Sequence, residues 1–332
     1  MTRFESVHTR MFRNAGPQEK IPVGISACLL GKQVRFDGGH KRSAFCTNML
    51  SQYFEFVPYC PEVAIGMGTP RDPVRLVWEG EEKRMVGTKD PDRDFTEPMK
   101  AWAEQQAGQL EGLSGFIFMQ KSPTCGVFRT KVYEKNRHPN GAGSGLWAEA
   151  VMTENPLLPV EEAGRLNDPH LLENFLTRVF TLHEWKRSLG DQPTAGRLVD
   201  FHSRHKLLIM AHDPAALQAM GRLVASLNQN NAEQVSREYL NQLMKALGRT
   251  ATRRRHTHVL QYINRFLRRF VPRAALEELH AVREQYAHGD VPLVVPITLL
   301  KHYVGMMPEG HYLSNQVYLQ PHPCNLGLRN AI

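Results

Sequence analysis

The pattern of apolar and polar residues changes once along the chain, close to Gly190. Before that point, short apolar runs alternate with longer stretches in which apolar residues recur three and four positions apart. The short runs predict strands and the longer stretches predict helices, in the order of a β/α sheet domain. The predicted strands cover 21–27, 54–59, 75–78 and 115–120, and the predicted helices cover 43–53 and 95–110.

Beyond Gly190 the strand pattern disappears and only the helical spacing remains. It predicts helices at 198–210, 217–227, 235–247, 259–270 and 276–286. We therefore expect an α/β N-terminal domain with a mainly parallel sheet, followed by an all-α C-terminal domain. The expected boundaries are a flexible leader at 1–20, the α/β domain at 21–190 and the helical domain at 191–332.

Composition narrows the classes of function. With 332 residues, 42% of them hydrophobic and 22% charged, the chain can bury a core, which excludes a disordered protein. Five irregularly spaced cysteines do not suit a disulfide framework and indicate a reducing compartment. No run reaches the ~18 apolar residues of a membrane span, and the leader lacks the apolar core of a signal peptide. We expect a soluble, cytoplasmic protein without a membrane partner.

Three cysteines follow predicted strands. Cys28 and Cys60 come directly after the first and second strands, and Cys125 comes a short turn after the fourth. The carboxyl ends of parallel strands form the ligand-binding edge of an α/β sheet, so these side chains can converge there. Three converging thiolates would suit a soft metal or an iron-sulfur cluster. The alternative, small buried thiols at strand ends, stays open at this point because free cysteine is often buried.

Five ordered segments surround these cysteines. They are Ile25-Ser-Ala-Cys28-Leu-Leu-Gly31, Val34-Arg-Phe-Asp-Gly38, Val57-Pro-Tyr-Cys60-Pro-Glu-Val63, Pro70-Arg-Asp-Pro73 and Lys121-Ser-Pro-Thr-Cys125-Gly126. Together they resemble the thiouracil desulfurase (desulfidase) family. The resemblance implies an α/β fold and a [4Fe-4S] cluster held by Cys28, Cys60 and Cys125. It also implies that the fourth iron is open and binds the sulfur that is removed from a thiolated nucleobase.

Two polar residues beside the cysteines are the predicted catalytic groups. An iron without a protein ligand is a Lewis acid for thiocarbonyl sulfur, and a nearby carboxylate can activate the attacking water. We predict Glu62 as that carboxylate and Ser122 as a group that bonds the substrate ring or relays a proton, as the resemblance also implies. The alternatives are a capping or surface glutamate and a turn serine. Arg35, Asp37 and Arg71 are predicted to orient the substrate, or merely to pair with each other.

The remaining two cysteines stand outside these motifs. Cys46 falls inside the predicted helix 43–53, where it could be a fourth cluster ligand or, as is usual for a helical cysteine, a packing residue. Cys324 lies in the proline-rich tail and has no motif around it.

The segment Phe201-His-Ser-Arg-His-Lys-Leu-Leu-Ile-Met-Ala-His-Asp213 and the closing Tyr318-Leu-Gln-Pro-His-Pro323 resemble the YbgA-like helical domain. This resemblance implies a helical fold and no assigned activity. His202 and His205 share a helix face with Lys206, and His212 lies further along. They could bind metal or phosphate, but without a carboxylate partner a polar helix face is the preferred interpretation.

Positive charge is concentrated in the helical half. The net charge is +8, and from Lys245 to Arg273 there are nine Lys or Arg and no acidic residue. Such a stretch predicts contact with the phosphates of a polyanion such as RNA, and a solvated helix face is the alternative. The predicted nucleic-acid contacts are Arg253, Arg254, Arg255, Arg265, Arg268 and Arg269.

These features combine into one functional hypothesis. We expect an enzyme that uses a [4Fe-4S] cluster to remove sulfur hydrolytically from a thiolated pyrimidine such as thiouracil, free or within RNA. The alternative is a nucleic-acid-binding protein whose iron-sulfur cluster is structural or senses redox state. Substrate-dependent release of sulfide separates the two, because only the desulfurase produces it.

Overall fold

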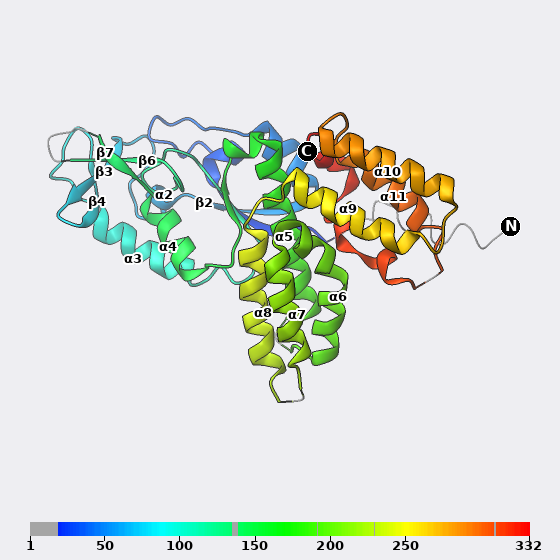
Figure 1. Cartoon of the computed structure of the whole chain (residues 1–332). Helices are drawn as coiled ribbons and strands as arrows, with labels where there is room; N and C mark the ends of the chain where they lie inside the picture. Colours follow the sequence, from blue (N-terminus) through cyan, green and yellow to red (C-terminus); the bar gives the residue numbers. More distant parts are fainter. Residues whose placement is uncertain (1–18, 135–138, 191, 229, 309) are drawn as a thin grey trace. The chain divides into compact units, whose positions relative to one another are not determined.

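The computed structural model describes residues 19–134, 139–190, 192–228, 230–308 and 310–332 (Figure 1). The chain divides into one compact unit at Glu19–Asn167 and a second that includes Asp168–Ile332. The predicted leader at 1–20 lies almost wholly outside the described residues. Within the described ranges, no helix combines the length and the apolar character needed to cross a bilayer.

The first sheet of the N-terminal unit is parallel throughout. Its strand order is β2 (Phe54–Tyr59), β1 (Ile21–Ser26), β5 (Phe116–Phe118) and β8 (Val160–Glu162). Most side chains of β1 and all those of β5 are buried, as is typical of parallel strands covered on both faces. The predicted strands at 21–27, 54–59 and 115–120 are thereby confirmed, and the three are direct neighbours in the sheet.

A second, mixed sheet lies in the same unit. Its order is β4 (Glu82–Gly87), β3 (Val74–Glu79), β6 (Thr130–Tyr133) and β7 (Pro139–Gly143). The strands β3 and β4 form an antiparallel hairpin, whereas β3 and β6 are parallel. The predicted strand at 75–78 is confirmed as β3, but it belongs to this sheet rather than to the first. A short apolar run identifies a strand and carries no information about which neighbour it pairs with.

The helices of the N-terminal unit follow the predictions in part. The predicted helix 95–110 is confirmed as α3 (Thr96–Ala107), and α2 (Pro61–Ala64) and α4 (Leu146–Glu154) complete the unit. The predicted helix 43–53 is instead a π turn at Phe45–Met49 followed by a 3₁₀ turn at Leu50–Gln52. Hydroxyls within it bond to main-chain carbonyls four residues back, as from Ser51 to Thr47 at 2.6 Å. Such bonds compete with a regular helix.

The second unit is helical. Its helices are α5 (Pro169–Ser188), α6 (Ala195–His212), α7 (Pro214–Ala225), α8 (Ala232–Leu247), α9 (Arg253–Leu267), α10 (Arg273–His288) and α11 (Val294–Val304). The all-α prediction is confirmed for the described residues beyond about 195. The helix α11 was not predicted because Pro296 interrupts its apolar run. Proline is tolerated there because it lies in the first helical turn, where a main-chain N–H has no helical partner.

The expected domain boundary at 190/191 differs from the structure, in which α5 belongs to the helical unit. The amide of Asn174 on α5 donates to the carbonyl of Leu247 at 2.8 Å, and Glu173 pairs with Arg329 at 3.5 Å. No helix was predicted at 169–188, and apolar spacing does not record which helices a segment packs against, so the boundary was expected after α5 rather than before it.

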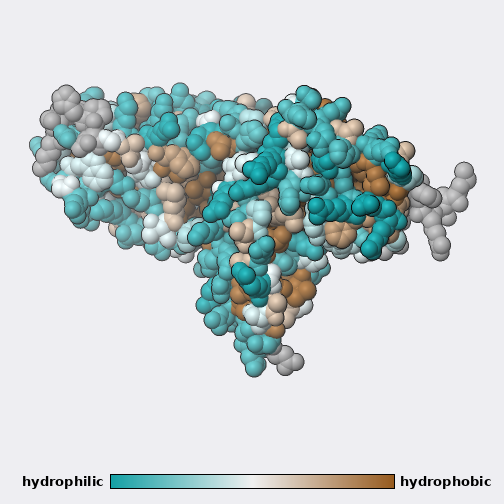
Figure 2. Space-filling model, viewed as in Figure 1, coloured by the Kyte–Doolittle hydropathy of each residue, from teal (hydrophilic) through white to brown (hydrophobic). Residues whose placement is uncertain are grey.

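The helix α9 illustrates how the helical core is built. Its buried residues Val259, Leu260, Ile263 and Leu267 recur three and four apart and face the core. The visible side of α9 is mostly hydrophilic (Figure 2).

Candidate active site

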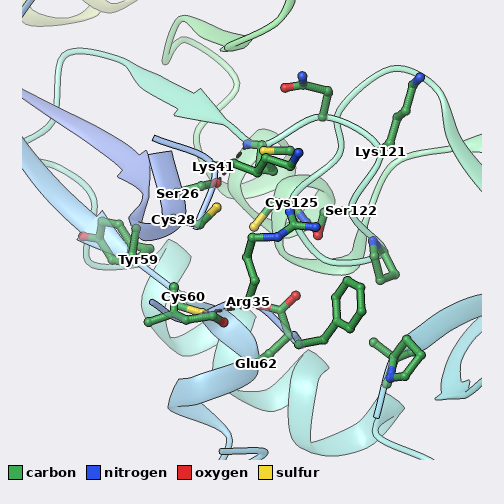
Figure 3. A pocket seen from close by; sticks show the side chains of 18 of the residues that line it. Ser26, Cys28, Arg35, Lys41, Tyr59, Cys60, Glu62, Lys121, Ser122 and Cys125 are labelled. Atoms are coloured by element: carbon green, nitrogen blue, oxygen red, sulfur yellow. Dashed lines mark hydrogen bonds between the residues drawn. The ribbon is translucent and has the colours of Figure 1, made fainter. Parts of the chain in front are cut away.

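The three cysteines that follow strands line one cavity of about 550 Å³ (Figure 3). Cys28 lies in a 3₁₀ turn after β1, Cys60 follows β2 directly, and Cys125 ends the turn after β5. Because β1 pairs with both β2 and β5, parallel pairing brings the carboxyl ends of all three strands together. The structure therefore places the predicted ligand residues around the same space, with Cys28 and Cys125 pointing into it.

The thiols are kept neutral by their surroundings. Burial, and next the charge of Glu62, raises the pKa of Cys60 to about 11. Burial is also the main cause of the raised pKa values of Cys28 and Cys125. A metal reverses this preference, since a coordinating thiol loses its proton, so loading this site would release protons.

The donor set suits an iron-sulfur cluster better than a single ion. Among the residues that the structure describes, no three His, Cys, Asp or Glu side chains are close enough to coordinate one metal ion. Each cysteine of a [4Fe-4S] cluster binds a different iron, so the three sulfurs need a cavity between them rather than one shared coordination sphere. The described lining residues include no fourth cysteine, which would leave one iron without a cysteine ligand.

Glu62 is buried beside Cys60, in the first turn of α2. Its Oε1 accepts a hydrogen bond of 2.7 Å from the Thr124 hydroxyl. Its Oε2 lies 3.6 Å from the Cys60 sulfur and 3.8 Å from an Arg71 guanidinium nitrogen. The carboxylate thus lies at the cavity that the cysteines share, as a catalytic role requires, and is neither a surface group nor a helix cap.

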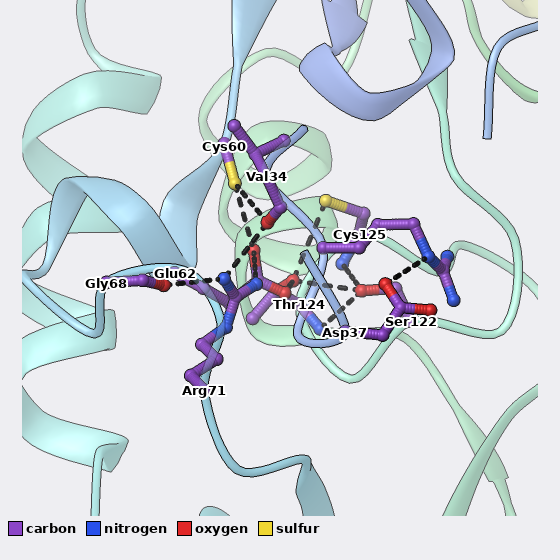
Figure 4. A network of polar contacts seen from close by, with 10 residues as sticks. Val34, Asp37, Cys60, Glu62, Gly68, Arg71, Ser122, Thr124 and Cys125 are labelled. Atoms are coloured by element: carbon purple, nitrogen blue, oxygen red, sulfur yellow. Dashed lines mark hydrogen bonds and ion pairs between the residues drawn. The ribbon is translucent and has the colours of Figure 1, made fainter. Parts of the chain in front are cut away.

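Ser122 lines the same cavity and is joined to Glu62 through Thr124 (Figure 4). Its Oγ accepts from the main-chain N–H groups of Thr124 and Cys125, at 3.3 and 3.1 Å, and lies 3.0 Å from the Thr124 hydroxyl. Ser122 therefore orders the turn that carries Cys125, as well as facing the cavity. Sequence reasoning missed Thr124, although it stands inside the Lys121–Gly126 motif.

The three predicted substrate-orienting residues have different surroundings. Arg71 lines the cavity, but its guanidinium donates to the carbonyls of Val34 and Gly68, at 2.9 and 3.0 Å (Figure 4). Arg35 also lines the cavity. Asp37 is not among the described lining residues, is half exposed and pairs with Arg35 at 3.6 Å. A hydrogen bond from the Gly39 N–H lowers the pKa of Asp37.

The cavity carries more positive than negative charge. Besides Arg35 and Arg71, its lining includes Lys41 and Lys121, whereas Glu62 is the one acidic residue among the described lining residues. The two lysines were not predicted. Lys121 opens the Lys121–Gly126 motif, but nothing in the sequence near Lys41 links that lysine to the cysteines. A hydrogen bond of 3.0 Å from its main-chain N–H to the Cys28 carbonyl places it there.

The remaining cysteines lie elsewhere. Cys46 is buried but is not among the described residues that line the cavity, so the structure favours packing over ligation for it. Cys324 is exposed, and its sulfur accepts a hydrogen bond from Lys301 at 3.7 Å.

The histidines of α6 are bound to their neighbours. The rings of His205 and His212 are buried and lie 2.9 and 2.6 Å from the carbonyls of Phe201 and Arg249, respectively. The interpretation of a polar helix face is wrong for these two, because their rings are buried in the helical unit. His202 is half-buried against the Tyr239 hydroxyl at 3.1 Å.

The predicted nucleic-acid contacts fall into two groups. Arg254, Arg265, Arg268 and Arg269 are exposed on α9 and just after it. Arg253, which is also exposed, and Arg255 donate to the carbonyls of Tyr286 and His212, respectively. These two guanidinium groups therefore hold the helical unit together.

Comparison with known proteins agrees with this division of the chain. Residues 23–163, which hold the three cysteines, match the family model described as 2-thiouracil desulfurase. Residues 206–323 match the model of a protein family of unknown function, DUF1722. The chain thus combines a domain of the 2-thiouracil desulfurase family with a helical DUF1722 domain.

Individual proteins are similar to parts of the chain. The uncharacterized protein YbgA of Escherichia coli (strain K12) is 31% identical over 160 residues, which are 48% of this chain and 94% of YbgA. The chain therefore belongs to the YbgA family. The uncharacterized protein YbbK of Bacillus subtilis (strain 168) is 26% identical over 145 residues, covering 40% of this chain and 95% of YbbK. A solved structure titled [4Fe-4S]-dependent thiouracil desulfidase TudS is 30% identical, covering 46% of this chain and 95% of TudS, with a TM-score of 0.35.

Proposed function

We propose that the protein is a [4Fe-4S]-dependent desulfurase that removes sulfur from a thiolated pyrimidine. The observation that carries the proposal is the convergence of Cys28, Cys60 and Cys125 on one cavity that also holds the Glu62 carboxylate. The match of residues 23–163 to the 2-thiouracil desulfurase family supports the same reaction. The domains are proposed to be a desulfurase-like α/β domain and a YbgA-like helical domain.

The proposed chemistry is hydrolytic. When bound, the cluster supplies a Lewis acid, an iron free of cysteine, for the thiocarbonyl sulfur. Glu62 accepts a proton from a water molecule, whose oxygen forms the new bond to the ring carbon. The carbon–sulfur bond breaks and sulfur leaves as hydrosulfide, so neither ring nor enzyme is oxidised or reduced. Ser122 faces the ring and is connected to Glu62 through Thr124.

The charge around the cavity favours a substrate that carries phosphate. Arg35, Lys41 and Lys121 line it, and neutralising a phosphate is the ordinary use of such groups. A thiolated nucleotide, free or within RNA, would place a phosphate beside its reacting ring. We therefore expect turnover of such substrates at least as fast as that of the free base.

The test begins with protein purified without oxygen. We expect about four irons and four acid-labile sulfides per chain, as in a [4Fe-4S] cluster, and release of sulfide from added thiouracil or thiouridine. Cys60→Ser should lose the iron and the activity together. Cys46→Ser is the matched control, because Cys46 is buried outside the described cavity lining, and it should keep both. Iron retained in full by Cys60→Ser would contradict the assignment.

A second candidate function rests on the exposed arginines of α9. These side chains suit sequence-independent contact with RNA phosphates. If the protein binds RNA through these arginines and its cluster is structural or senses redox state, iron will be present but no thiolated substrate will release sulfide.

A further inference from the structure

Thr124 lies between the two proposed catalytic groups and is fully buried. Its Oγ1 is 2.7 Å from Glu62 Oε1 and 3.0 Å from Ser122 Oγ (Figure 4). The same oxygen is 3.6 Å from the sulfur of Cys125. One hydroxyl thus contacts the proposed base, the proposed ring-facing group and a proposed cluster ligand.

Counting protons assigns the direction of these bonds. A hydroxyl has one proton, and a carboxylate only accepts. The bond from Thr124 to Glu62 is the short, charge-assisted one, so the Thr124 proton lies there rather than toward the more distant sulfur. Ser122 must then donate to Thr124, because its own oxygen already accepts from two main-chain N–H groups.

The hydrogen bonds therefore run in one direction, from the main chain of the Cys125 turn through Ser122 and Thr124 to Glu62. This chain occupies Oε1 of the carboxylate. The other oxygen, Oε2, faces Cys60 and Arg71, both of which line the cavity. Oε2 is consequently the oxygen that remains for a water molecule.

We propose that Thr124 is a positioning residue of the desulfuration reaction. Its hydroxyl fixes Glu62 Oε1 and ties the carboxylate to Ser122, so that Oε2 is presented to the attacking water. This inference rests on the proposed function and assigns a role to a residue that does not itself touch the substrate.

The experiment compares Thr124→Val with Thr124→Ser. Valine keeps the shape and removes both hydrogen bonds, whereas serine keeps the hydroxyl. For Thr124→Val we expect kcat, normalised per bound cluster, to fall about 10²-fold, the order expected when a reacting group is misplaced. KM should stay close to the parent value, because ground-state binding is unchanged. Thr124→Ser should recover most of kcat.

Iron content and a control separate positioning from folding. The iron per chain of Thr124→Val should match the parent, since Thr124 supplies no ligand. Thr177→Val removes another fully buried hydroxyl, one with no partner among the described residues, and should leave kcat unchanged.

The possible outcomes separate this inference from the proposed function. A kcat for Thr124→Val within threefold of the parent, or a Thr124→Ser as slow as the valine variant, would overturn the role of Thr124 and leave the desulfurase proposal standing. If the parent enzyme releases no sulfide, both the role of Thr124 and the desulfurase proposal are contradicted.

Discussion

Lowering the pH from 7 to 5 should destabilise the helical unit by about 2 kcal/mol through His256 alone. This side chain on α9 is 3% exposed, and its Nδ1 lies 3.0 Å from the Tyr318 hydroxyl. Burial is the main cause that lowers the pKa of His256 from 6.5 to about 3, and the nearby charge of Arg329 lowers it further. The imidazole is therefore neutral in the folded protein throughout this pH range.

Acid lowers the free energy of unfolding because the unfolded state binds the proton more readily than the folded state. Below about pH 6.5 the unfolded chain protonates His256 and the folded chain does not, so acid favours unfolding. The free energy of unfolding falls by up to about 1.4 kcal/mol per pH unit, and it continues to fall until the pH reaches the pKa of His256 in the folded state. Glu173 adds little between pH 7 and 5, because its pKa is lowered from 4.5 in the folded state and the carboxyl is mostly ionised in both states down to pH 5.

Urea unfolding of the full chain, followed by far-ultraviolet circular dichroism at both pH values, measures the effect. The matched variant is His256→Asn, whose amide occupies the place of Nδ1 and does not titrate. The parent should lose about 2 kcal/mol more than the variant between pH 7 and 5, while the contributions of other histidines cancel. Equal losses in the two proteins would refute a neutral, buried His256.

Two further predictions concern the same unit. Glu173→Gln leaves the buried charge of Arg329 without its partner and should lower the free energy of unfolding by about 3–5 kcal/mol. A decrease of less than about 1 kcal/mol in the urea assay would contradict this prediction. Replacing Arg254 and Arg265 by Ala should weaken RNA binding and reduce its salt slope by about two. The control Arg237→Ala, at an arginine already paired with a glutamate on α8, should have little effect; an unchanged salt slope in the double variant would count against an RNA surface.

Local pattern predicted the elements of the site well. Each cysteine was expected at a strand end because the apolar runs of β1, β2 and β5 are short and stop abruptly before it. The five ordered motifs then indicated the desulfurase family without any knowledge of contacts. The helix at 43–53 was the exception, since side-chain hydroxyl bonds to the main chain are invisible to apolar spacing.

Contacts between distant segments could not be predicted in the same way. Thr124 gains its importance from Glu62, which lies 62 positions earlier in the chain. Arg253 and Arg255 look like the other arginines of α9 in sequence, yet they bond carbonyls of α10 and α6. For the same reason, the domain boundary was expected after α5, whereas the structure has it before α5.

By itself, the sequence determined the two-part organisation, the strands β1, β2, β3 and β5, the helices α3 and α6 to α10, and the residue types available for the chemistry. These properties depend on side-chain periodicity and on neighbours in the chain, which a sequence records directly. Tertiary structure alone decided that β1 lies between β2 and β5, and hence that three thiols and a carboxylate share one cavity. Strand pairing depends on main-chain hydrogen bonds that every residue type except proline can form, so residue identity does not encode which strands become neighbours.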